Sequence, residues 1–168
     1  MASGTTTSTV PTDTALAGFV QGVELAAVAL YAQAAVVIAS PAAVSVMATF
    51  AAHHRQHALA FAAVAGADAV HGPLPGVLEA LSPSSLLVSE RDGLGFLFAL
   101  ESRMASTHEY LLGRFTTVPA VSLSCTTVPV EAQHAAVLGT LLSMPLGPMM
   151  PTVQGVDGFL SPEQFASP

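Results

Sequence analysis

The stretch FAAHHRQHALAFAAVAG, residues 50–66, decides the fold because it places histidines inside a run that otherwise consists mostly of alanine and other apolar residues. Two of them, His54 and His57, are three residues apart, so on a helix they point to one face. A second such pair, Glu131 and His134, occurs in VEAQHAAVLGTLL, residues 130–142. Each pair therefore forms a two-pronged ligand set on one helix.

In each half of the chain a lone glutamate lies 30 residues before the first member of the pair and 33 residues before the second. Glu24 stands at these distances before the first pair, and Glu101 before the second. A helix rises about 1.5 Å per residue, so thirty positions across a short turn return the chain to the same height in a bundle. The two halves of the chain therefore repeat each other, and we expect all six side chains to meet in the core.

Helix start and stop signals divide the chain into four long helices. Asp13 and Thr14 are cap candidates for the first helix. Ser40 before a proline opens the second, and residues 89–92 fit a capping box before the third. Pro129 lies in the middle of the fourth helix and is expected to kink it or split it in two. The expected helices cover residues 14–39, 41–66, 89–115 and 119–143.

Residues 67–88 contain several glycines and prolines, so we expect a long crossover between the second and third helices, with a short helix near 77–81. Two long helices joined by a tight turn pack as antiparallel neighbours, and a crossover of this kind joins the halves of a bundle. The sequence thus predicts an all-α, antiparallel four-helix bundle. The predicted parts are a flexible lead (1–13), the bundle (14–143) and a proline-rich tail that wraps it (144–168).

Composition limits the class of protein. At 168 residues and 17.0 kDa the chain has the length of one domain and can bury a core. Hydrophobic residues make up 52% and charged residues 9%, so a membrane-spanning bundle has to be considered. Residues 53–57 are five adjacent polar residues within an apolar run, and they would be very costly at mid-membrane depth. We therefore expect no transmembrane segment.

Charge and cysteine content exclude further classes. The net charge of −7 comes from eleven acidic residues against four arginines, so no basic patch exists for nucleic acid. The single cysteine, Cys125, excludes an internal disulfide and a cysteine-based zinc site. Small apolar residues and few charges favour self-association, so a homodimer is expected. Residues 1–14 lack the pattern of a signal peptide, which leaves a cytoplasmic location open, or an envelope or exported one if a signal peptide was removed.

One glutamate from each of two helices and a Glu-x-x-His pair from each of the other two is the pattern by which ferritin-like bundles hold two metal ions. Carboxylate oxygens suit iron or manganese, and imidazole nitrogens fill terminal positions. We interpret six residues as ligands of two transition-metal ions, iron first, with manganese, zinc or copper as alternatives: Glu24, His54, His57, Glu101, Glu131 and His134. In this interpretation Glu101 and Glu131 bridge or chelate the ions, with Glu24 as a further candidate, and the three histidines are terminal.

Several stretches resemble the bacterial ferritin-like domain family that includes desiccation-related proteins. They are VELAAVALYAQA (23–34), FAAHHRQHALAFAAVAG (50–66), FLFALESRMASTHEYLLGRF (96–115), VEAQHAAVLGTLL (130–142) and, at the end, GVDGFLSPEQF (155–165). The resemblance implies a ferritin-like bundle with the same six ligands, but no particular reaction, because activity in this family is poorly defined. Many members resemble exported proteins, which favours an envelope location.

His54 departs from the ferritin-like pattern, which has a glutamate at this position. The site would then offer three glutamates and three histidines. The loss of one carboxylate removes a bridging or charge-balancing anion, so an oxidised diferric state would be less well stabilised. A mononuclear site or a site with unequal metals is therefore an alternative.

Two residues are candidates for contact with the ligands. His108 lies two turns after Glu101, about 10 Å along the helix, so we expect it to contact a ligand or line a channel rather than to bind metal. Tyr31 stands in the same relation to Glu24. A core tyrosine is the alternative interpretation there.

Two further histidines are expected outside the site. His53 neighbours His54 and should point away from it, although a register shift of one residue would exchange them. His71 lies in the crossover beside glycine and proline and should be exposed to solvent.

Two functions follow from these features. The first is a dimetal-carboxylate protein that reacts with dioxygen or peroxide, as a di-iron or mixed-metal oxidase or peroxidase. The second is a non-catalytic helical protein with a structural or stress-protection role in the cell envelope. No G-x-S-x-G, P-loop or Rossmann glycine pattern is present, so nucleophilic catalysis has little support.

Overall fold

The computed structural model describes residues 11–149 and 158–165, and within these ranges it contains helices and no strands. Four long helices form the bundle: α1 (Asp13–Ala34), α2 (Pro41–Ala65), α4 (Glu90–Leu112) and α5 (Val118–Leu141). The shorter helices are η1 (Ala35–Val37), η2 (Gly66–Asp68), α3 (Pro75–Leu81), α6 (Leu146–Met149) and η3 (Pro162–Gln164). The predicted all-α bundle is confirmed.

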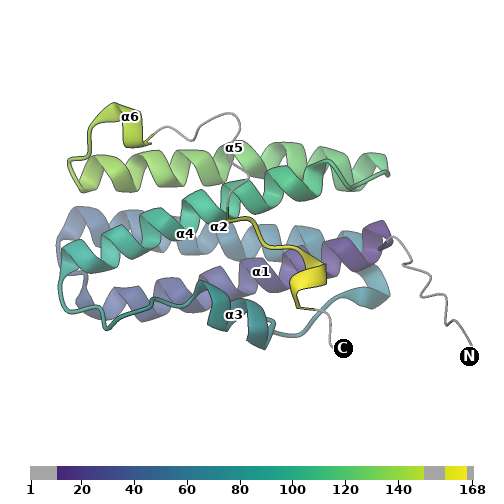
Figure 1. Ribbon diagram of the computed structural model, residues 1–168, viewed down its shortest axis with the longest axis horizontal. Coiled ribbons are helices and arrows are strands. Elements are labelled where there is room, and N and C mark those ends of the chain that lie inside the picture. The colour runs from purple at the N-terminus through teal and green to yellow at the C-terminus, as the bar shows by residue number, and fades with distance from the viewer. Residues whose placement is uncertain (1–10, 150–157, 166–168) are drawn as a thin grey trace, which may run out of the picture.

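The four long helices form two antiparallel pairs, α1 with α2 and α4 with α5 (Figure 1). α1 also packs on α4, and α2 on α5, so the four helices surround a common core. Between the pairs the chain returns along the bundle past α3, and α2 and α4 consequently run in the same direction (Figure 1). This is the long crossover between the second and third long helices that the sequence predicts.

Two acidic residues, each the first of its helix, hold the start of a helix in the other half of the chain. Asp13 of α1 accepts a hydrogen bond of 2.6 Å from the Thr117 N–H, just before α5. Glu90 of α4 accepts one of 2.8 Å from the Ser40 N–H, just before α2. The first N–H groups of a helix have no partner within it, and negative charge is favoured there. The two carboxylates therefore fix the register of α5 against α1 and of α2 against α4.

The ends of the first helix differ from the prediction. Thr12 is the N-cap, and its Oγ1 accepts from the Ala15 N–H at 3.2 Å. Asp13 and Thr14 were expected there, but the Asp13 carboxylate is engaged at the start of α5. α1 begins at Asp13, one residue earlier than predicted, and ends at Ala34, where η1 follows. Residues 1–10 of the predicted lead lie outside the described residues.

The boundaries of the next helices follow local chemistry. Gly66 ends α2 with φ of 58°, a left-handed conformation that glycine adopts without steric cost. Ser89 caps α4, its side chain accepting from the Asp92 N–H at 3.2 Å. α4 ends at Leu112, three residues before the predicted end at residue 115.

Pro129 does not split the last long helix, because α5 continues without a break from Val118 to Leu141. Proline removes the hydrogen bond to the carbonyl four residues earlier, which belongs to Cys125. Both residues are exposed, so water can hydrate that carbonyl. Of the two outcomes expected at Pro129, a kink or a split, the split does not occur.

The tail returns to the bundle at its described end. Leu160 is fully buried, and its N–H donates to the Thr107 hydroxyl at 3.0 Å. Glu163 pairs with Arg114 at 2.6 Å. Residues 150–157 and 166–168 of the predicted tail lie outside the described residues.

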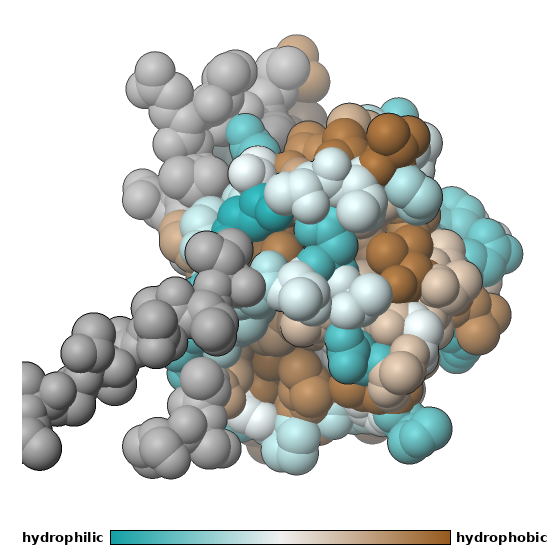
Figure 2. Space-filling model, turned by 90° about the vertical axis from the view of Figure 1, so that its right-hand side faces the viewer, coloured by the Kyte–Doolittle hydropathy of each residue, from teal (hydrophilic) through white to brown (hydrophobic). Residues whose placement is uncertain are grey.

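The apolar character of the first helix is explained by the core. Residues Asp13–Val37 form a segment long and apolar enough to cross a membrane, yet 72% of its most apolar window is buried inside the bundle. On the outside, hydrophilic and hydrophobic residues alternate in patches at one end of the bundle (Figure 2). Several large apolar side chains are exposed, among them Val36, Leu59 and Val118. The homodimer suggested by the composition stays a prediction.

Two helical glycines make a matched test of the packing between α1 and the crossover. We expect Gly95→Ala to raise the free energy of unfolding by about 0.5–1 kcal/mol, because the site is open and alanine favours helix. Gly18→Ala should instead lower it by about 1–3 kcal/mol, because the new Cβ would lie 2.3 Å from the Asp68 carbonyl oxygen. Urea denaturation measures both. Equal stabilisation by the two substitutions would contradict this close approach.

Candidate metal centre

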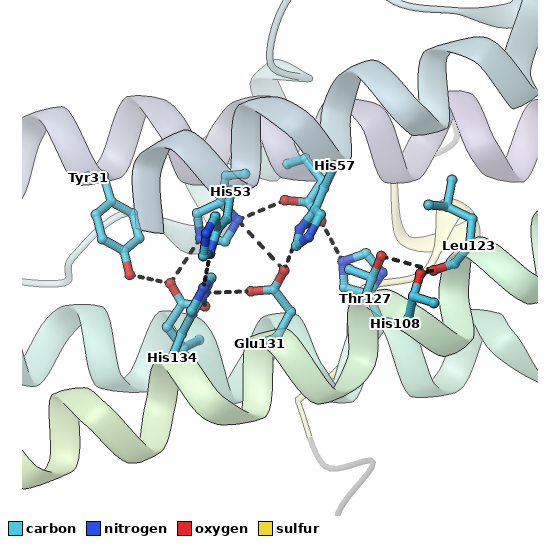
Figure 3. Close-up of polar contacts among 12 residues, drawn as sticks. Tyr31, His53, His57, His108, Leu123, Thr127, Glu131 and His134 are labelled. Carbon is cyan, nitrogen blue, oxygen red and sulfur yellow. Dashed lines mark hydrogen bonds and ion pairs between the residues drawn. The ribbon is translucent and has the colours of Figure 1, made fainter. Parts of the chain in front are cut away.

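Six side chains from the four long helices converge in the core, and Figure 3 shows the network of contacts among them. Four of the six have no exposed surface, a fifth exposes 2%, and His57 exposes 15% of its side chain. They are Glu24 from α1, His54 and His57 from α2, Glu101 from α4, and Glu131 and His134 from α5. The structure therefore brings all six predicted residues together.

The two halves place these residues at matching positions along their helices. Glu24 follows Asp13 by 11 residues, and Glu101 follows Glu90 by the same number. His54 follows Ser40 by 14 residues, and Glu131 follows Thr117 by the same number. Because the two caps fix the register of the helices, they also bring the site residues to a common level.

The first group of ligand atoms lies between α1, α2 and α5. Nδ1 of His54 is 2.8 Å from Oε2 of Glu24. Nδ1 of His57 is 2.8 Å from Oε1 of Glu131 and 3.5 Å from Oε1 of Glu24. One ligand atom from each of these four residues lies within 4.8 Å of all the others.

The second group lies between α2, α4 and α5. Nε2 of His54 is 2.9 Å from Oε1 of Glu101. Nδ1 of His134 is 3.2 Å from Oε2 of Glu101 and 3.2 Å from Oε2 of Glu131. These four residues also offer ligand atoms that lie within 4.8 Å of one another. His54 and Glu131 belong to both groups, so the two groups overlap.

Some buried atoms of the cluster have no hydrogen bond. Nδ1 of His57 and both carboxylate oxygens of Glu131 are buried without a hydrogen-bond partner. His57 Nδ1 lies only 2.8 Å from Glu131 Oε1, so the two atoms are close but not aligned as donor and acceptor. Buried polar groups seldom stay unsatisfied. A buried imidazole nitrogen and a buried carboxylate that lack hydrogen bonds, within one group of potential ligand atoms, suit a bound cation.

The charges of the cluster depend on one another. Burial alone raises the pKa of Glu24, and the charge of Glu131 adds to this, but hydrogen bonds from His108 and His54, together with the nearby imidazole of His57, outweigh both and lower it to about 2. Burial lowers the pKa of His57, and the carboxylates of Glu131 and Glu24 outweigh it and raise it to about 9. A metal ion that binds these imidazoles must therefore displace protons.

Each of two ligand glutamates has a further partner outside the cluster. Nε2 of His108 lies 2.7 Å from Oε1 of Glu24, and His108 is fully buried. The Tyr31 hydroxyl donates to Oε1 of Glu101. Each of these two residues thus contacts the site glutamate of the other half of the chain, and not the glutamate on its own helix. Such partners hold ligand side chains in place.

His53 does not point away from the site, and that expectation is wrong. Its Nδ1 lies 2.9 Å from Nε2 of His134, while Nδ1 of His134 faces the two glutamates. The two imidazole rings are nearly parallel, and His134 stacks on Phe50 with ring centroids 3.9 Å apart. α2 packs against both α1 and α5, so two neighbouring histidines can reach the core from one helix. His71 is exposed, as predicted.

No protein-family model, curated protein or solved structure matches this chain in the three comparisons. The resemblance to the ferritin-like family therefore stays a prediction. The donor set itself is informative: three carboxylates and three imidazoles, without a thiolate, suit divalent transition-metal ions. The structure establishes a buried cluster of histidine and glutamate side chains that can hold a metal ion.

Proposed function

We propose that this chain is a ferritin-like protein that holds two transition-metal ions in the core of its bundle. The observation that carries the proposal is the pair of overlapping ligand groups, each with four potential ligand atoms within 4.8 Å of one another. All four long helices contribute to them. The metal-binding groups are thus built into the core and are not a loose set of surface acids.

The spacing of the ligand atoms supports this proposal. Two ligands that bind one ion with bonds of about 2.1 Å lie about 3.0 Å apart at a right angle and about 3.4 Å apart at a tetrahedral angle. The distances between imidazole nitrogens and carboxylate oxygens in the cluster run from 2.8 to 3.9 Å, and all but the longest lie within about 0.3 Å of these values. The unpartnered atoms of His57 and Glu131 would gain a partner in the ion.

The connectivity supports the ferritin-like part of the proposal. Bundles of that type have one long crossover, and their metal ligands come from single glutamates on two helices and from residue pairs three apart on the other two. Both features are present here, with α1 and α4 supplying the single glutamates. The mixed oxygen and nitrogen ligands suit iron and manganese, with zinc or copper as alternatives.

Two redox-active ions bound here would supply electrons to a small oxidant such as dioxygen or peroxide. The protein residues would hold and shield the site. Tyr31 fixes Glu101 from one side, and the same residue lines a pocket of about 420 Å³ between α1 and α2, together with Met47 and Arg55. We propose that a small oxidant approaches through this pocket, past the tyrosine ring.

Metal analysis tests the proposal. Plasma mass spectrometry of the purified or reconstituted protein should find about two equivalents of iron, manganese, zinc or copper per chain. The double variant Glu131→Ala/His134→Ala should lose this metal, since it removes the shared carboxylate and a terminal imidazole. His71→Ala, which removes an exposed histidine of the crossover, is the matched control and should keep both equivalents. No stoichiometric metal after reconstitution would refute the proposal.

A non-catalytic role is the second candidate, and one observation favours it. The cluster connects all four long helices, so bound ions would cross-link the bundle and stabilise it without any reaction. A structural or stress-protection protein needs no more than this.

Oxygen consumption separates the two candidates. The reduced, metal-loaded protein should consume dioxygen or peroxide, and the Glu131→Ala/His134→Ala variant should not. A loaded protein that consumes neither, but unfolds at a higher temperature than the metal-free protein, would favour the structural role.

A further inference from the structure

We propose that His54 bridges the two metal ions, with Nδ1 bound to one ion and Nε2 to the other. This inference rests on the proposed two-metal site and assigns the role of one ligand in it. It replaces the terminal role that the sequence suggests for His54, and it gives a physical meaning to the histidine that stands where the ferritin-like pattern has a glutamate.

The two nitrogens of His54 face different ligand groups. Nδ1 lies 2.8 Å from Oε2 of Glu24, and Nε2 lies 2.9 Å from Oε1 of Glu101. The two glutamates come from α1 and α4, on opposite edges of the same imidazole ring. His54 has no exposed surface, so water reaches neither nitrogen.

The other two ligand histidines are placed differently. His134 turns only Nδ1 toward the glutamates, because its Nε2 faces Nδ1 of His53 at 2.9 Å. His57 approaches Glu24 and Glu131 through Nδ1 alone. Among the three ligand histidines, only His54 has both nitrogens among the carboxylates, which is the requirement for a bridge.

Glu131 is arranged in the same way as His54. Its Oε1 faces His57, and its Oε2 faces His134. Each ion would thus receive one terminal glutamate, one terminal histidine, one oxygen of Glu131 and one nitrogen of His54. Two equivalent sites with two nitrogens and two oxygens result, in keeping with the repeated halves of the chain.

The bridge also balances the buried charge. Binding through both nitrogens requires the neutral imidazole to lose its remaining N–H proton to solvent water or buffer, while each nitrogen lone pair forms a bond to one ion. No electron is transferred in this step. Three carboxylates and one imidazolate then carry four negative charges, which match two divalent cations. Neutrality matters because uncompensated charge in a protein core is very costly.

Nitrogen-15 NMR of the zinc-loaded, histidine-labelled protein tests the bridge without any assay of activity. In the wild type with two zinc ions, both ring nitrogens of His54 should have the shift of metal-bound nitrogen, and neither should carry a proton. The terminal histidines His57 and His134 should each keep one N–H. The His54 signals are assigned as those lost in His54→Gln.

Zinc affinity of three variants supplies a second readout. His57→Ala should weaken binding of one ion and His134→Ala binding of the other, at least tenfold each, while His54→Gln should weaken both. Circular dichroism checks that each variant folds. If His54→Gln does not fold, the wild type still decides, because one histidine with both ring nitrogens bound to metal is recognised without assignment by its two shifted nitrogen signals and missing N–H.

Each outcome has a distinct meaning. If two zinc ions bind and His54 keeps an N–H, His54 is terminal and the bridge is refuted, while the two-metal function stands. If the wild type binds no zinc at all, and no other metal at stoichiometric level, the proposed function itself fails.

Discussion

The burial of three carboxylates in an apolar bundle is the constraint on which the rest of the structure depends. Glu24, Glu101 and Glu131 have no exposed surface, and the core around them consists largely of alanine and leucine. A buried carboxylate without compensation is costly enough to unfold a small domain. Five neighbouring side chains offset this cost, because each of them contacts one or more of these carboxylates: His54, His57, His134, His108 and Tyr31.

The compensation requires the helices to be held in register. A helix that slid by one turn would move its ligands by about 5 Å, farther than the contacts of the cluster reach. Asp13 and Glu90 prevent this, because each ties the start of its own helix to the start of a helix in the other half. The equal intervals from these caps to the site residues explain how a repeat in the sequence becomes a single cluster in space.

Much of this arrangement could be predicted from the sequence, because its signals are periodic. Apolar helices interrupted at matched intervals by Glu24, Glu101 and the two pairs give both the bundle and the residues that meet in it. The contact of His53 with His134 could not be foreseen, since it depends on how α2 is rotated between two neighbours. The role of Asp13 was also hidden, because its partner lies 104 residues away. The continuity of α5 through Pro129 could not be predicted either, because the exposure of that proline is set by tertiary packing.

The departure at His54 links the fold to the chemistry that we propose. A glutamate at this position would give a site rich in carboxylates, whereas an imidazole places a nitrogen in each ligand group. Imidazole nitrogen suits zinc and copper as well as iron, so in the proposed site this one residue bears on which metal would be selected.

Anomalous X-ray diffraction from crystals of the metal-loaded protein tests the central claim most directly. The account predicts two anomalous peaks inside the bundle, one among Glu24, His57 and Glu131 and the other among Glu101, Glu131 and His134, with His54 between them. A single peak, or peaks only on the surface of the protein, would contradict it.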